Sequence, residues 1–217
     1  MSLTWILTEI EAEVRELVGM PGTSGLDETA MRDRINDFYQ NFFPEDIDVQ
    51  ELESWWEFDT ADDDDCEESL PATVRTISKP MTLKDSDDTI SKVKFYLNKA
   101  VFFELYPEDA TDEEAERGTP AAALLYNRTL YLRPKADEVF TFKAASKIKP
   151  DALTAGTAPL NVQWGPAIAQ GTAVMIKNRG SDFEAAKEKD KAYQALITII
   201  NRRDLKQSSN QRAMPRW

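Results

Sequence analysis

Apolar residues recur at helical spacing near both ends of the chain and alternate at strand spacing in its middle. Helices and strands are thereby separated along the sequence, which favours an α+β fold over alternating βαβ units. We expect an N-terminal helix pair, a central and mainly antiparallel β-sheet with hairpins, and a C-terminal helix pair followed by an extended basic tail. The expected helices occupy residues 3–18, 27–43, 98–106, 161–177 and 182–206, and the expected strands occupy residues 54–60, 70–83, 91–96, 121–132 and 138–145.

Capping and breaking residues mark the expected helix ends. Gly19 suits a helix C-terminus, Asp27 and Asp182 can cap the helices that follow them, and Pro44 is expected to stop the second helix. The apolar stripe of that second helix is expected in the core, and its aromatic members are Phe38, Tyr39 and Phe42. Glycine and alanine between residues 165 and 173 predict a thin helix that other elements approach closely.

Two hairpins are expected in the middle of the chain. The first joins residues 54–60 to 70–83 and carries a run of acids at its tip. The second joins residues 121–132 to 138–145 across Arg133–Asp137, and it has the clearer strand alternation. Alternation on these strands predicts one covered face and one wetter face.

A chain of 217 residues without internal repeats fits one domain. We expect a single α+β domain over residues 1–206, with an acidic loop at 59–69, and a C-terminal arm at 207–217. No linker divides the chain into two expected cores.

Composition argues against catalysis. The chain has no histidine, which excludes Ser-His-Asp and Cys-His catalysis and the usual zinc sites, and it has no Gly-rich phosphate loop. Cys66 is the only cysteine, so no internal disulfide forms. We expect no enzyme, no catalytic residue, no metal and no cofactor. No apolar run is long enough to span a bilayer and the N-terminus lacks signal-peptide features, so we expect a protein that is cytosolic or assembled in the cytosol, with no membrane partner.

Charge is strongly segregated. Residues 45–69 hold thirteen acids and no lysine or arginine, while residues 201–217 carry five basic residues against Asp204 alone. The acids are explained by a solvated loop, by pairing with a neighbour's basic tail, or by a calcium site, although consecutive aspartates lack the alternating spacing of known calcium loops. The candidate lumen-facing or inter-subunit residues are Asp62, Asp63, Asp64, Asp65, Glu67 and Glu68.

Several short segments, in this order and spacing, resemble the head-to-tail adaptor or neck proteins of tailed bacteriophages. The resemblance covers most of the chain, although no segment in it is a catalytic signature. The segments are VRELVG (14–19), INDFY (35–39), SLP (69–71), FY (95–96), FFELYP (102–107), LYLRP (130–134) and NQRAMPRW (210–217).

The resemblance implies a structural virion protein. Its copies would form a ring beneath the dodecameric portal protein, with a downstream tail or nozzle protein below and a central channel through which DNA passes without specific binding. The C-terminal helix and arm would reach the portal or a neighbouring subunit. The arginine guanidinium groups of this arm can pair with carboxylates on a partner, and its tryptophan can insert into an apolar pocket. A frayed terminus without a partner is the simpler alternative. The expected partner-binding residues are Arg202, Arg203, Lys206, Gln211, Arg212, Arg216 and Trp217.

Two other functions stay open on the sequence. A tail-terminator or tail-tube subunit would also form rings, but it would stack through sheet edges. An acidic inhibitor that mimics DNA could use residues 45–69, because their carboxylate density approaches the charge spacing of a duplex.

Overall fold

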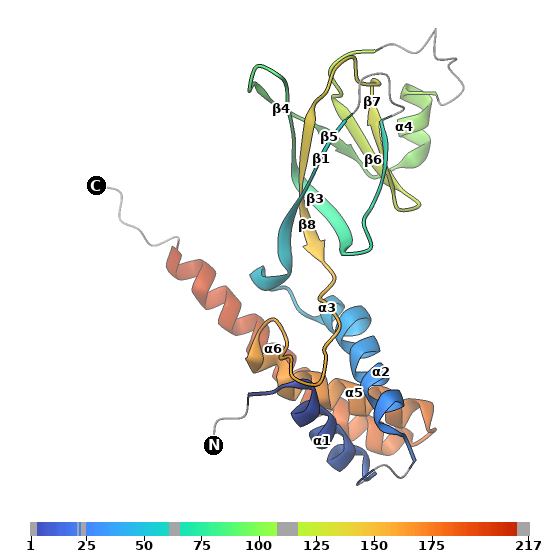
Figure 1. The fold of residues 1–217 in the computed structure, drawn as a ribbon, viewed down its shortest axis with the longest axis vertical. Helices are drawn as coiled ribbons and strands as arrows, with labels where there is room; N and C mark the ends of the chain where they lie inside the picture. The colour runs from blue at the N-terminus through green and yellow to red at the C-terminus, as the bar shows by residue number, and fades with distance from the viewer. Residues whose placement is uncertain (1–3, 21, 23–24, 61–65, 108–116, 212–217) are drawn as a thin grey trace. The chain divides into compact units, whose positions relative to one another are not determined.

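The chain folds into two compact units, a helical unit and a β unit. The computed structural model describes residues 4–20, 22, 25–60, 66–107 and 117–211, the last eight by their helical backbone alone. The helical unit combines Met1–Leu52 with Lys149–Trp217, and the β unit is the intervening Glu53–Ile148 (Figure 1). Helices and two largely antiparallel sheets confirm the α+β fold class.

The helical unit is built from both ends of the chain. Within the described residues, its α-helices are α1 (Leu7–Val18), α2 (Glu28–Asp37), α3 (Phe43–Asp46), α5 (Gly165–Arg179) and α6 (Phe183–Gln211). Short turns add η1, a π-helical segment (Phe38–Phe42), and two 3₁₀ segments, η2 (Gln50–Leu52) and η3 (Val162–Trp164).

Local sequence explains the ends of the first two helices. The Glu9 carboxylate accepts a hydrogen bond from the backbone N–H of Ile6 at the start of α1, and Gly19 ends α1 with a φ of 72°. The Asp27 carboxylate accepts the N–H of Ala30 at 2.7 Å, as expected for an N-cap.

Pro44 does not stop the second helix, contrary to the prediction. The chain passes from α2 through η1 into α3, where Pro44 lies in the first turn. Proline is tolerated there because a first-turn N–H has no intrahelical acceptor to lose. In η1 the Phe43 N–H instead reaches the carbonyl of Phe38, five residues back.

Helix α5 lies at the centre of the helical core and contacts α1, α2, η1 and α6. Its small residues are buried, as the predicted thin helix requires. A Cβ at Gly171 would lie only 2.0 Å from the Phe38 ring, and one at Gly165 would lie 2.4 Å from the Trp5 ring. Glycine is therefore needed at both positions to admit an aromatic ring.

The C-terminal helix is longer than predicted. Residues 207–211 were expected to be loop-like, but α6 continues to Gln211. Neither glycine nor proline occurs between Phe183 and Gln211, so no strong helix breaker interrupts it. The rest of the predicted arm, residues 212–217, lies outside the described residues.

The β unit contains two four-stranded sheets. Their orders are β1-β8-β3-β4 and β2-β7-β6-β5, and among the strand pairs of the described residues only β5–β6 is parallel. The elements are β1 (Glu53–Asp59), β2 (Glu67–Ser69), β3 (Val74–Lys84), β4 (Ile90–Lys92), β5 (Lys94–Tyr96), α4 (Lys99–Leu105), β6 (Ala122–Tyr126), β7 (Thr129–Arg133) and β8 (Thr141–Ile148).

Both predicted hairpins are wrong in their pairing. Strands β1 and β3 do not pair with each other, because β8 lies between them and pairs antiparallel with both. Within residues 121–133 the chain instead forms a hairpin of β6 and β7 through Asn127 and Arg128. Their φ angles of 51° and 63° fit a two-residue hairpin turn with positive φ at both central residues. Arg133–Asp137 is therefore not a hairpin turn, and the chain passes through it from one sheet to the other.

The buried side chains form separate cores in the two units, where the sequence predicted no division. The larger β core centres on an aromatic cluster of Trp56, Phe58 and Phe142, with ring centroids 4.9 to 6.1 Å apart. In register, Phe58 lies opposite Phe142 and Trp56 lies opposite Ala144. A role for residues 1–206 as one adaptor domain stays a prediction.

Candidate binding groove

An aromatic pair on η1 forms one wall of a groove in the helical unit. Phe38 and Phe42 stack with ring centroids 6.3 Å apart and planes 10° apart. Phe38 is buried because Gly171 lets its ring approach the backbone of α5, whereas Phe42 remains 48% exposed. The core prediction therefore holds for Phe38 and Tyr39 but is wrong for Phe42.

The groove has a volume of about 430 Å³ and lies among η1, α3, α5 and α6. Its wall is mainly apolar, and polar side chains lie along its edges. The lining residues are Phe38, Phe42, Asp46, Gly171, Val174, Met175, Asn178, Arg179, Asp190, Tyr193 and Gln194.

Tyr193 joins α6 to α3 at the edge of the groove. Its hydroxyl donates a hydrogen bond of 2.6 Å to Oδ2 of Asp46, and its ring meets Phe38 edge-on at 5.7 Å. Burial raises the pKa of Tyr193, and the hydrogen bond to the Asp46 carboxylate raises that pKa further. The hydroxyl therefore stays protonated and continues to donate at any physiological pH.

The groove edge is acidic in balance. Asp46 and Asp190 contribute two carboxylates, while the one lining cation, Arg179, lies 3.4 Å from Asp37 in an ion pair. A basic ligand with apolar side chains would match both the wall and the edge.

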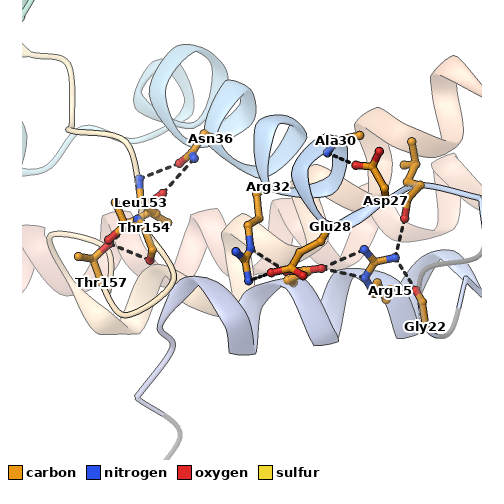
Figure 2. A network of polar contacts seen from close by, with 12 residues as sticks. Arg15, Gly22, Asp27, Glu28, Ala30, Arg32, Asn36, Leu153, Thr154 and Thr157 are labelled. Atoms are coloured by element: carbon orange, nitrogen blue, oxygen red, sulfur yellow. Dashed lines mark hydrogen bonds and ion pairs between the residues drawn. The ribbon is translucent and has the colours of Figure 1, made fainter.

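A buried ionic network holds α1 against α2, away from the groove. Glu11 accepts hydrogen bonds from Arg15 and Arg32, each at 3.0 Å, and Arg32 also pairs with Glu28. Arg15 continues to the backbone carbonyls of Gly22 at 2.5 Å and Leu26 at 3.0 Å (Figure 2). This network stabilises the loop between the two helices.

A second polar contact in the same view connects α2 to the chain that returns from the β unit. The Asn36 side chain donates to the Leu153 carbonyl at 3.1 Å and accepts the Leu153 N–H at 2.7 Å (Figure 2). The ionic network and the Asn36–Leu153 contact are both internal to the helical unit, so we assign them a role in stability.

The predicted acidic residues are only partly described. Asp62–Asp65 lie outside the described residues. Glu67 and Glu68 lie on β2, where the Glu67 carboxylate pairs at 3.1 Å with Arg133, a buried residue. Glu67 therefore has an internal partner, and Glu68 is exposed.

The predicted basic residues lie on or beyond α6. Arg202 is exposed and Arg203 donates to the side chain of Gln163, so Arg203 also has an internal partner. Lys206 and Gln211 lie on the helical backbone of α6, and Arg212, Arg216 and Trp217 lie outside the described residues.

The groove itself was missed at the sequence level. Its aromatic wall was assigned to the core, and no role was predicted for Asp190 or Gln194. The sequence does contain glycines in α5 and an aromatic stripe in the second helix, which together indicate a close contact between the two. It does not identify which ring approaches which glycine.

The protein is therefore an α+β chain of two units, and its helical unit carries an open apolar groove with carboxylates at its edge. No protein-family model and no curated protein matches the chain. Within the described residues, no group of three or more cysteine, aspartate or glutamate side chains could hold a metal ion. A search of the same residues finds no helix long and apolar enough to cross a membrane.

Proposed function

We propose that the chain is a structural virion protein of a tailed bacteriophage. Its copies form a ring beneath the portal, join the capsid to the tail and surround the channel through which DNA leaves. It acts by assembly rather than catalysis, takes no cofactor, and is incorporated into the virion neck after synthesis in the host cytoplasm.

The observation that carries this proposal is the shape of α6. Among the α6 side chains that the structure describes, which end at Arg203, the buried ones lie between Ala186 and Ile200. The helical backbone continues to Gln211. Figure 1 shows its last turns running past the other helices of the unit. A projecting helix with a basic end suits contact with another subunit better than it suits the stability of its own unit.

Segregated charge supports the same role. Carboxylates along a DNA channel would not neutralise phosphates, so DNA would pass without the strong binding that a basic lining gives through counterion release. The acids of residues 45–69 are the source of those carboxylates in this proposal.

The test is the mass of the purified chain, alone and mixed with portal rings, by light scattering and negative-stain microscopy. We expect the chain to add to a portal as a ring. Tubes formed by the chain alone would instead favour a tail-tube subunit, and a chain indifferent to every portal tested would favour the acidic inhibitor. An assembled ring with Asp62–Asp65 on its outer surface would refute the channel lining while leaving the adaptor role intact.

A further inference from the structure

We propose that the groove of the helical unit binds residues 212–217 of a second copy of the chain. The groove offers an aromatic wall with two carboxylates at its edge, and nothing in the rest of the described helical unit fills it. Phe42, nearly half exposed on that wall, gives an incoming aromatic ring a surface on which to stack.

The chemistry of the C-terminal segment matches the groove. Its sequence, RAMPRW, combines two arginines with a methionine, a proline and a terminal tryptophan. Asp46 and Asp190 are suited to the guanidinium groups, and the wall formed by Phe42, Val174 and Met175 is suited to the apolar side chains.

The length of α6 excludes binding within one copy. About 27 Å of helix separates Gln211 from Tyr193 in the groove, at a rise of about 1.5 Å per residue. The six residues after Gln211 span only about 20 Å when fully extended, and they would first have to reverse direction. The segment of another copy has no such constraint.

Binding of this kind joins unlike surfaces of identical subunits. A tail in one copy and a groove in the next make a head-to-tail contact, which closes into a ring when the rotation between copies permits. The inference rests on the proposed function for its setting, a ring of copies, but the contact itself needs no portal.

Photo-crosslinking of the full chain tests the contact directly. Trp217 is replaced by p-benzoylphenylalanine, isotopically heavy and light copies are mixed, and crosslinked peptides are identified by mass spectrometry in concentrated solution and on portal rings. We expect heavy–light crosslinks to residues 38–46 or 171–194. Crosslinks within one copy, crosslinks confined to other surfaces, or no crosslink under either condition would each overturn the proposal.

A charge reversal with a matched control gives a second measurement. Asp190→Arg places a cation at the groove edge, and we expect it to raise about tenfold the concentration at which copies associate, as measured by sedimentation equilibrium. Glu188→Arg makes the same charge change on the same helix outside the groove, and it should leave association unchanged. Equal effects of the two variants would overturn the proposal, and circular dichroism verifies that both fold.

The two proposals fail in different ways. If position 217 crosslinks to the portal and rings still form, the groove contact is refuted and the adaptor function stands. If copies crosslink through the groove but bind no portal, the adaptor function is refuted and the groove contact stands.

Discussion

Gly171 and Phe38 show how one residue without a side chain positions a candidate binding surface. The ring of Phe38 occupies the space where a Cβ would project from α5, and Phe42 stacks on that ring. The exposed part of the aromatic wall therefore depends on a glycine that lets the Phe38 ring lie against α5.

Gly171→Ala should destabilise the chain. Its methyl group would overlap the Phe38 ring, and relieving that overlap costs about 2 kcal/mol beyond the helix propensity that alanine adds. Urea unfolding measures the change. Gly156→Ala is the matched control, because nothing lies within 4 Å of its added methyl group, and it should change the unfolding free energy by no more than about 0.5 kcal/mol. Equal stabilities of the two variants would contradict the proposed packing.

Tyr193 predicts how stability depends on alkaline pH. Its pKa is raised in the folded chain above the ordinary value of 10.0, so the unfolded chain loses this proton first as the pH rises. The stabilisation is fully present below pH 10 and declines above it.

Tyr193→Phe should remove part of that decline. The variant also loses the hydrogen bond to Asp46, so we expect it to be less stable by about 1 kcal/mol at pH 8. Urea unfolding at pH 8 and above pH 10 separates the two effects. Tyr39, whose pKa burial also raises, should retain part of the pH dependence in the variant. Parallel losses of stability with pH in wild type and variant would refute the role of Tyr193.

At the scale of elements, the sequence predicted most helix ends correctly, with the exceptions of Pro44 and the end of α6, but it did not predict which strands pair. Asp27, Gly19 and Asn98 mark helix ends because each acts on backbone groups within a few residues. The partner of β1 is β8, far along the chain, and alternation identifies a strand without identifying its neighbour.

The β6–β7 turn was missed for a related reason. Asn127 and Arg128 take positive φ angles, but the glycine that usually follows asparagine in a tight hairpin turn is absent. The groove was missed because it depends on the close approach of α5 and η1, which no spacing within either segment encodes.

The network between α1 and α2 predicts a large effect from a small change. Glu11→Gln removes the carboxylate that both Arg15 and Arg32 contact, and Arg15 is itself buried. We expect a loss of about 3 kcal/mol in unfolding free energy, typical of breaking a buried ion pair. Glu16→Gln, on an exposed position of the same helix, should cost no more than about 0.5 kcal/mol. Thermal and urea unfolding measure the stability of both variants. Equal stabilities would show that Glu11 contributes no more than an exposed glutamate, which would contradict the prediction.

On the scale of the whole molecule, stability and assembly should be separable. Deleting Ser208–Trp217 leaves every described buried side chain in place, so the unfolding free energy should stay within about 0.5 kcal/mol of wild type. Assembly on portal rings, and association between copies, should both be lost. Rings that form normally from the truncated chain would refute the role of the C-terminal arm.

The division of the helical unit between the two ends of the chain affects how the protein is made. Glu53–Ile148 leaves the ribosome as one continuous stretch that contains all eight strands of the β unit found in the described residues. The helical core, in contrast, needs α5 and α6, which are synthesised after the β unit. During translation the apolar faces of α1 and α2 therefore stay uncovered until α5 and α6 have been synthesised, whereas the β unit already has all its described strands. We expect chaperone binding to nascent chains to be strongest after the β unit has emerged and before α5 and α6 have emerged.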